Sequence, residues 1–284
     1  MTTVPFHPLY SLLDVVNPVK IVDIGASAID GPPCYAPLLK AGYAQVVGFE
    51  PNLVALAELN QRKGASETYL RHAVGDGRRH SLRHCWAPGM TSLLEPNSEV
   101  LALFHGFSEW GRVVRTEEID TLRLDDIPET ADLDMLKLDI QGAELMVLEN
   151  ATERLKSTLV IHTEVEFLQM YVGQPLFSDI ERFLRQHGFV LHRFVQMISR
   201  AIKPMMVGND PRAGLSQLFW ADAVLVRDFV HVERLTPDQL LRTAAILHDC
   251  YQSYDLVLHL LLEHDRRTGL AYAKKFLHAI GAAQ

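Results

Sequence analysis

The sequence contains few cysteines and no long hydrophobic run. Its three cysteines, Cys34, Cys85 and Cys250, are scattered and odd in number, so they form neither a C-x-x-C zinc pattern nor a disulfide framework. No apolar stretch approaches the roughly 20 residues that span a bilayer. The first residues also lack the basic segment and apolar run of a secretory signal. We therefore expect a protein of the reducing cytoplasm with no membrane span.

Basic residues are scarce as well. There are 27 Lys and Arg against 35 Asp and Glu, which gives a net charge of −8. Nucleic-acid binding needs a basic surface, so no nucleic-acid partner is expected. The thirteen histidines form no H-E-x-x-H or other metal-spaced cluster. The dinucleotide fingerprint G-x-G-x-x-G is also absent, because Gly25 is followed by Ala26 and Ser27. This absence counts against an NAD-dependent oxidoreductase.

The chain does contain an alternation of strand-like and helix-like segments. Seven segments are predicted strands: Lys20–Ile24, Gln45–Glu50, Glu67–Val74, Met135–Ile140, Leu159–Val165, Phe189–Phe194 and Phe219–Val226. Four segments between them are predicted helices: Cys34–Lys40, Leu53–Lys63, Ala143–Leu155 and Ser178–His187. Strands and helices alternating at this spacing predict βαβ units. The expected fold is therefore α/β, with a doubly wound, mostly parallel, Rossmann-like sheet of seven strands.

Two regions depart from this alternation. Residues 80–125 read as an excursion, and such insertions commonly shape a substrate site. After Arg227 the composition shifts, and Thr236-Pro237-Asp238-Gln239 forms a capping box before three predicted helices. We expect one domain over residues 1–228 and a helical extension over 229–284. The apolar stripe of the extension, which packs into the core or forms a homo-oligomer contact, contains Leu256, Val257, Leu260 and Leu261.

Acidic residues close several of the predicted strands. Asp23 precedes the turn at Gly25, Glu50 and Asp139 end strands, and Asp76 lies in the glycine turn after another strand. Ligands of open parallel sheets bind at the carboxyl ends of strands. A carboxylate at Glu50 can accept hydrogen bonds from both hydroxyls of a ribose, or it can simply cap the following helix. Asp76 can accept an exocyclic adenine amine, or it can be a turn residue.

These stretches resemble the FkbM-type S-adenosylmethionine-dependent methyltransferases, a branch of the class I methyltransferase fold. The matching segments are VDIGAS (22–27), VVGFEPN (46–52), AVGD (73–76), IDTLRLDDI (119–127), LKLDIQGAELMVLENA (136–151), IHTEVEF (161–167) and QPLFSDIERFLRQHGF (174–189). The resemblance implies methylation of a hydroxyl on a sugar, glycan or other small natural-product acceptor. It also implies a pocket for S-adenosylmethionine built from Asp23, Gly25, Ala26, Ser27, Glu50, Asp76 and Asp139.

A hydroxyl acceptor must lose its proton to a base within hydrogen-bond reach. The candidate catalytic residues are Asp139, Glu164 and His162, with His105 as a further base in the excursion. We favour Glu164, which belongs to the family-like I-H-T-E block. For both histidines the alternative is a structural hydrogen bond. Asp139, Glu164 and a third carboxylate can also hold a divalent metal, although no ligand spacing calls for one. A second hypothesis is a non-catalytic nucleotide- or protein-binding module that uses the C-terminal helices as its interaction surface.

Overall fold

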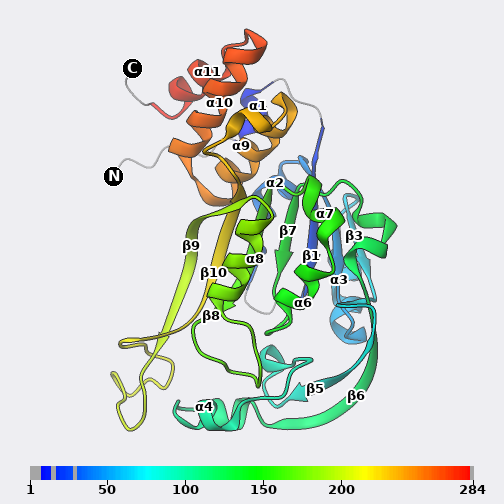
Figure 1. The fold of residues 1–284 in the computed structure, drawn as a ribbon, viewed down its shortest axis with the longest axis vertical. Helices are drawn as coiled ribbons and strands as arrows, with labels where there is room; N and C mark the ends of the chain where they lie inside the picture. The colour runs from blue at the N-terminus through cyan, green and yellow to red at the C-terminus, as the bar shows by residue number, and fades with distance from the viewer. Residues whose placement is uncertain (1–7, 14–16, 28–30, 282–284) are drawn as a thin grey trace.

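The computed structural model describes residues 8–13, 17–27 and 31–281. The strands of its main sheet are β1 (Val19–Ile24), β2 (Ala44–Phe49), β3 (Glu67–Leu70), β7 (Met135–Leu138), β8 (Val160–Glu166), β9 (Phe189–Arg200) and β10 (Gln217–Arg227). Their order is β3-β2-β1-β7-β8-β10-β9 (Figure 1). Only β10 runs antiparallel to its neighbours in this sheet. The prediction of a mostly parallel, seven-stranded α/β sheet is confirmed.

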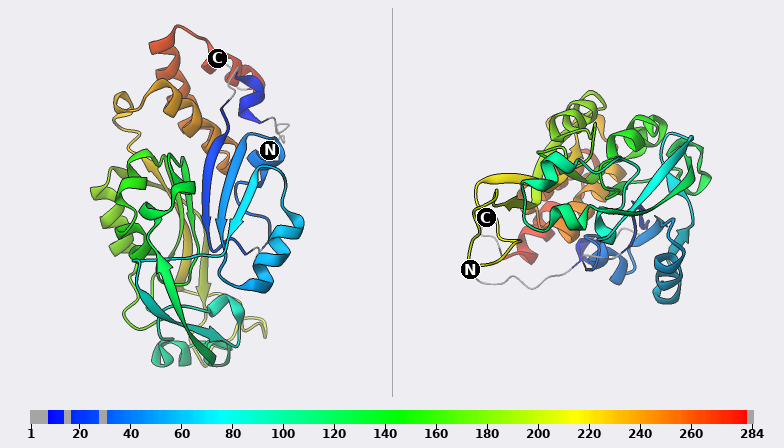
Figure 2. Two further views of the ribbon diagram at one scale, coloured as in Figure 1. Left: turned by 90° about the vertical axis from the view of Figure 1, so that its right-hand side faces the viewer. Right: turned by 90° about the horizontal axis from the view of Figure 1, so that it is seen from below.

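Helices cover both faces of the sheet because the buried strands are apolar on both sides. Along β1, Ile21 belongs to the core under one set of helices and Val22 to the core under the other. Helices on the Ile21 face are α1 (Leu9–Leu12), α2 (Ala36–Lys40) and α9 (Pro237–Tyr251), backed by α10 (Tyr254–Thr268) and α11 (Tyr272–Ala279). Helices on the Val22 face are α6 (Glu144–Glu149), α7 (Thr152–Ser157) and α8 (Phe177–Gln186), drawn in green in Figure 2.

The excursion forms a small separate sheet beyond the carboxyl ends of the parallel strands. Its strands are β4 (Ala73–Val74), β6 (Val113–Leu122) and β5 (Arg79–Cys85), in that order. Its helices are α4 (Ser98–Ala102) and α5 (Phe107–Trp110). Figure 1 shows this unit at the opposite end of the molecule from α9, α10 and α11. This unit has a core of its own, which includes Phe104, Phe107 and Tyr171. Phe219 of β10 belongs to the same core, so the unit packs against the main sheet there.

Two predicted elements are wrong in extent. Residues 67–74 are not one strand: β3 pairs with β2, whereas Ala73–Val74 leaves the main sheet to pair with β6. Residues 143–155 are not one helix either, because the chain breaks at Asn150 between α6 and α7. The Asn150 side chain donates to the Met146 carbonyl oxygen at 2.9 Å, a local bond that competes with helix continuation. At residue 73, backbone pairing with the distant strand β6 overrides the local strand pattern. At residue 150, a side-chain hydrogen bond interrupts the local helix pattern.

The C-terminal helices are part of the main core. The predicted capping box is confirmed: the Gln239 N–H donates to Thr236 Oγ1 at 3.2 Å, and the Thr236 N–H donates to Gln239 Oε1 at 2.9 Å. The predicted apolar stripe of α10 is buried, so its residues belong to the core. No helix in the described ranges is long and apolar enough to cross a bilayer.

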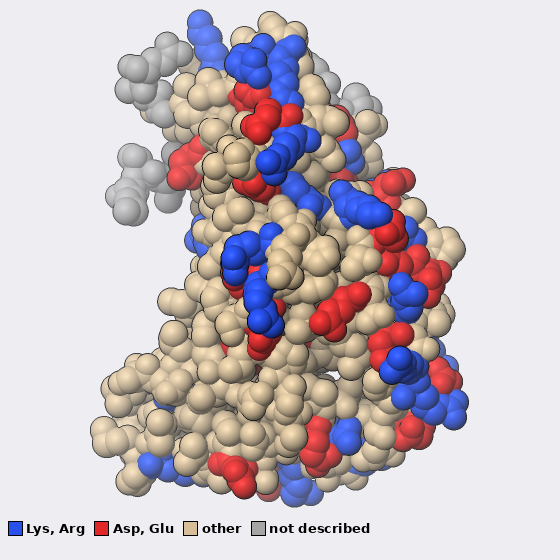
Figure 3. All heavy atoms as spheres, in the orientation of Figure 1, with Lys and Arg blue, Asp and Glu red and all other residues tan. Residues whose placement is uncertain are grey.

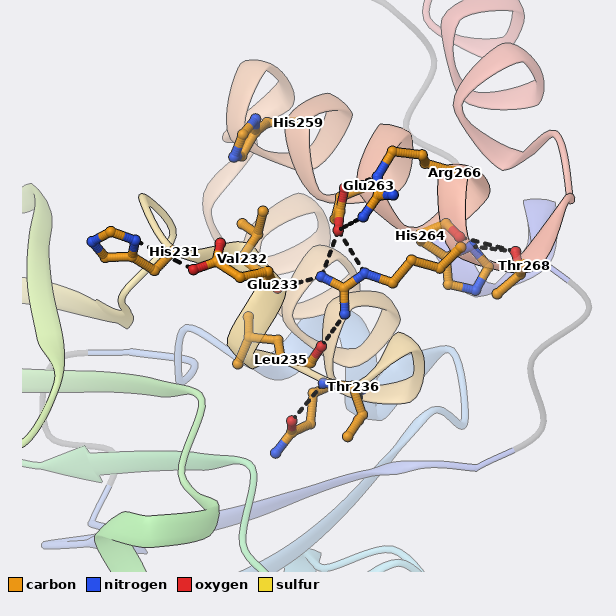
Figure 4. Close-up of polar contacts among 12 residues, drawn as sticks. His231, Val232, Glu233, Leu235, Thr236, His259, Glu263, His264, Arg266 and Thr268 are labelled. Carbon is orange, nitrogen blue, oxygen red and sulfur yellow. Dashed lines mark hydrogen bonds and ion pairs between the residues drawn. The ribbon is translucent and has the colours of Figure 1, made fainter.

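An arginine ties α10 to the segment that precedes α9. Arg267 donates to the carbonyl oxygens of Val232 at 2.7 Å and Leu235 at 2.5 Å. It also pairs with Glu263, which lies beside Arg266 and His264 in Figure 4. Hydrogen bonds from Arg266 and Arg267 lower the pKa of Glu263 to about 2. The segment 232–235 is therefore held against α10 through its backbone carbonyl oxygens, which any residue at those positions would provide.

The β9–β10 hairpin carries exposed apolar side chains. In Figure 3 the region around the β9–β10 hairpin, at the lower left, is largely uncharged, whereas red and blue side chains intermingle on the right. Exposed apolar side chains of this hairpin are Val195, Met197, Ile202, Met205, Met206 and Leu215. The hairpin thus gathers several exposed apolar side chains, whereas the four stripe residues of α10 are buried.

Candidate active site

One face of the sheet changes from apolar to polar toward the carboxyl ends of its strands. Strand alternation places Asp23 on the same face as Ile21, and that face packs under α9 at its amino end. Asp23 is in register with Lys137 of β7, and Lys137 with His162 of β8. The three polar residues therefore form a row across adjacent strands. Glu164 follows on the same face of β8, opposite Asp222 of β10.

Asp23 is a buried acceptor that already has protein partners. It is 1% exposed; its Oδ2 accepts from the Tyr35 hydroxyl at 2.6 Å and its Oδ1 from Lys137 Nζ at 3.0 Å. Burial lowers the pKa of Lys137, but attraction to Asp23 outweighs this and raises it above its ordinary value. The ion pair is therefore maintained inside the protein. These roles of Tyr35 and Lys137 were not predicted from the sequence; the Lys137-x-Asp139 pattern on a buried strand was the available signal.

The turn Gly25–Ser27 is fixed by backbone contacts. Gly25 has φ +81°, and a Cβ on it would lie 2.0 Å from the Asp139 carbonyl oxygen. Only glycine fits this close approach between the ends of β1 and β7. The N–H groups of Gly25 and Ala26 both donate to the Phe49 carbonyl oxygen at 3.1 Å. The predicted cofactor turn is therefore rigid as far as Ser27, and residues 28–30 lie outside the described ranges.

Glu50 does not cap the following helix. Asn52 is the N-cap of α3 (Leu53–Arg62), and its side chain accepts from Val54 N at 2.9 Å. The Glu50 carboxylate instead accepts from Asn52 N at 2.7 Å and is 7% exposed. Burial raises the pKa of Glu50, and the N–H groups of Asn52 and Ser27 partly offset this. The capping alternative for Glu50 is thus removed.

Asp76 lies in the small sheet and not at the end of a main-sheet strand. It follows β4 and accepts from Arg78 N at 3.0 Å, and its Oδ1 lies 2.7 Å from His80 Nε2. Burial raises the pKa of Asp76, but the hydrogen bonds from His80 and Arg78 lower it below its ordinary value. The expectation that Asp76 closes the third strand of the main sheet is therefore wrong, because that strand ends at Leu70.

A glutamine joins the two candidate bases. The Gln141 side-chain amide donates to Asp139 Oδ1 and to Glu164 Oε2, both at 2.9 Å. Gln141 has φ +57°, a left-handed conformation that non-glycine residues seldom adopt. The Glu144 carboxylate fixes the same turn by accepting from the N–H groups of Ile140 and Gly142 at 2.9 Å. This role of Gln141 was not predicted from the sequence, although Gln141 lies within the family-like D-I-Q-G-A-E block.

Carboxylates gather around this bridge. Burial raises the pKa of Glu164 well above its ordinary value, with further increases from Asp139, Glu166, Glu144 and Asp222. Burial likewise raises the pKa of Glu144 to about 7. A carboxylate with a raised pKa is a stronger proton acceptor when it is ionised. Within the described residues no three His, Cys, Asp or Glu side chains are grouped to hold a metal ion.

His162 is buried and structural in its contacts. Its Nδ1 lies 3.1 Å from the Tyr251 hydroxyl at the end of α9, and the two rings stack. Burial, with a contribution from Lys137, lowers the pKa of His162 to about 3. A ring with so low a pKa is a poor proton acceptor at neutral pH. His105, which lies in the excursion, hydrogen-bonds at 3.0 Å to the Met205 carbonyl oxygen between β9 and β10. Both histidines thus have the structural partners that the alternative interpretation required.

The chain is similar to several known proteins. A relative is the 2-O-methyltransferase NoeI of Sinorhizobium fredii (strain NBRC 101917 / NGR234), which is 27% identical over 186 residues, or 58% of this chain and 70% of NoeI. Among solved structures, magnesium protoporphyrin IX methyltransferase (ChlM) of Synechocystis PCC 6803 with bound SAM has a TM-score of 0.38 at 13% identity, covering 77% of this chain and 76% of that one. A SAM-dependent methyltransferase of Aquifex aeolicus has a TM-score of 0.32 at 12% identity, covering 78% and 90%. The Methyltransferase FkbM domain matches residues 23–191, and the chain therefore belongs to the FkbM methyltransferase family.

Proposed function

We propose that this protein is an S-adenosylmethionine-dependent O-methyltransferase acting on a hydroxyl of a sugar, glycan or other small natural-product acceptor. The observation that carries the proposal is the bridged pair Asp139–Gln141–Glu164 at the carboxyl ends of β7 and β8. This pair lies in the sheet of a chain that belongs to a methyltransferase family. The named activity of NoeI, a 2-O-methyltransferase, supports oxygen as the methyl acceptor.

The residues present suit this cofactor. The glycine turn at Gly25 brings backbone close to the strand ends, and the buried Glu50 carboxylate ends β2. We assign Glu50 to the ribose hydroxyls, because a carboxylate offers two acceptor oxygens to a vicinal diol. Asp139 is assigned to the cationic amino-acid end, while Asp23 orients Tyr35 and Lys137 beside the pocket. Asp76 contributes an acceptor for the adenine amine from the small sheet. When bound, S-adenosylmethionine supplies an electrophilic methyl group on a sulfonium.

Glu164 is the proposed base. Its pKa is raised by burial and by neighbouring carboxylates, so its ionised form takes a hydroxyl proton readily. It is 9% exposed, and water competes little for it there. The excursion, which contacts the turn after β7 through Ser92 Oγ and the Gln141 carbonyl oxygen at 2.6 Å, supplies the acceptor side. Holding the acceptor oxygen in line is the main contribution expected of the protein.

Calorimetry with S-adenosylmethionine and with its demethylated product S-adenosylhomocysteine tests the first step. Transfer of a radiolabelled methyl group to a panel of mono- and oligosaccharides and polyols tests the second. We expect both cofactor forms to bind and at least one hydroxylated acceptor to be labelled. Failure of both forms to bind would reject the proposal. Binding without transfer to any hydroxylated acceptor would favour the non-catalytic binding module.

A further inference from the structure

Gln141 occupies a backbone conformation that its own side chain does not favour. At φ +57° a residue with a Cβ is strained relative to the right-handed conformation. Glycine avoids that strain, and Gly142 next to it already has φ +103°. A strained residue that is kept at a site commonly has a role there. The side chain that is retained at this cost is the one that joins Asp139 and Glu164.

The bridge is made of two well-formed hydrogen bonds. The two donor hydrogens of the Gln141 amide are directed to carboxylates from different strands, each at 2.9 Å. The backbone of Gln141 is held from the excursion, because Ser92 Oγ donates to its carbonyl oxygen at 2.6 Å. Ser92 is itself 1% exposed. The amide is thus positioned by both the main sheet and the small sheet.

We propose that Gln141 is a positioning residue of the methyl-transfer site: its amide holds the Glu164 carboxylate in place for the acceptor hydroxyl and keeps it ionised. This inference rests on the proposed function. Amide donors favour the charged form of a carboxylate, and here they oppose the like charges that surround Glu164. Those charges are Asp139 after β7, Glu144 of α6, Glu166 of β8 and Asp222 of β10, and the Tyr171 hydroxyl also faces this group.

The decisive variant is Gln141→Gly. It removes the amide and at the same time relieves the left-handed backbone, so the substitution introduces no new backbone strain at this turn. The matched control is Gln252→Gly, since Gln252 has φ +53° at the exposed end of α9. Gln252→Gly should melt no lower than the wild type, whereas Gln141→Gly also loses two hydrogen bonds to carboxylates, so its folding is checked by a cooperative thermal transition and an unchanged circular dichroism spectrum. Gln252→Gly should retain wild-type activity, whereas Gln141→Gly should lose roughly 100-fold in kcat, as expected when a catalytic group loses its position.

Proton binding separates positioning from a structural role. In Gln141→Gly the acidic limb of the pH–rate profile should move up by about one pH unit, because a donor to the ionised base is gone. The same shift should appear in the apo protein, as a titration of Glu164 followed by NMR with labelled glutamate. The affinity for S-adenosylhomocysteine should stay unchanged.

Two results would overturn the inference. One is a wild-type kcat and pH profile in Gln141→Gly, and the other is an unshifted Glu164 titration in that variant. A wild-type protein that transfers no methyl group would reject the proposed function instead. The apo titration would still report on the bridge in that case.

Discussion

At the scale of single residues, the oxygens of each buried carboxylate decide what it can do. Asp23 gives one oxygen to Tyr35 and the other to Lys137, so it holds the site together. Glu50 is bound by backbone N–H groups at the end of β2, and no side-chain cation neutralises it in the contacts described. Two acidic strand ends that look alike in the sequence are therefore different in the structure.

Glu50→Gln should weaken binding of S-adenosylhomocysteine about 10- to 100-fold. The amide can still accept from Asn52 N, so the local fold is kept. What is lost is a charge-assisted hydrogen bond, worth about 1.5–3 kcal/mol. Calorimetric Kd values provide the measurement, and Glu153→Gln, an exposed carboxylate paired with Lys156 on α7, is the control. A Kd for Glu50→Gln within threefold of wild type would show that Glu50 does not contact the ribose.

His162 should make the protein sensitive to acid. Its folded pKa of about 3 lies below the ordinary value of about 6.5, so the unfolded chain binds the proton first. Stability is therefore complete above pH 6.5 and is lost as the pH falls toward 3. Between pH 7 and 5 the wild type should lose about 2 kcal/mol relative to His162→Gln, which does not titrate. Urea unfolding of both proteins at the two pH values measures this difference; parallel pH dependences would contradict it.

At the scale of elements, structural features that are encoded by adjacent residues were predicted well. The capping box at Thr236 and Gln239 is local, and it forms as expected. The ends of the strands and of the helix at residues 143–155 were predicted less well. Whether residue 73 continues β3 or joins β6 depends on a partner near residue 121, which no local pattern specifies. Segments with one strong local signal are thus more predictable than segments with two competing partners.

Thr236→Ala should lower the free energy of unfolding by about 1 kcal/mol. The alanine leaves the Gln239 N–H at the start of α9 without its side-chain acceptor, and N-cap losses have that size. Chemical denaturation measures the change. Thr116→Ala, at an exposed position of β6, is the matched control and should stay within about 0.5 kcal/mol of wild type. Equal effects of the two substitutions would mean that the cap does not contribute.

At the scale of the whole molecule, the C-terminal helices and the sheet share one core. Buried residues of α9 and α10 such as Leu240, Ile246 and Leu260 belong to the same cluster as Val19 and Val46 of the sheet. The composition shift after Arg227 marks a change of architecture, from βα units to helices. The structure shows that this change does not coincide with a break in the packing.

Residues 1–228 alone should therefore not fold. Each large apolar side chain withdrawn from the core costs about 1.5–3 kcal/mol, and α9 and α10 supply more of these than the usual total stability of about 5–15 kcal/mol can cover. We expect an aggregated or molten fragment without a cooperative thermal transition in circular dichroism. The full chain under the same conditions is the control. A fragment that melts cooperatively near the full-length temperature would show that the extension is an independent domain.

The α/β alternation, the capping residues and the acidic strand ends at Asp23, Glu50 and Asp139 could be predicted without coordinates, because these depend on neighbouring residues and on hydrophobic periodicity. The place of Asp76, the oxygens that are already bonded and the side chains that share a site depend on the tertiary structure. Glu164 lies 23 positions from Gln141, and His162 lies 89 from Tyr251. These pairs meet because parallel strands align their carboxyl ends and because α9 returns to the sheet. Burial then sets the proton affinities, and burial is a property of the packed molecule.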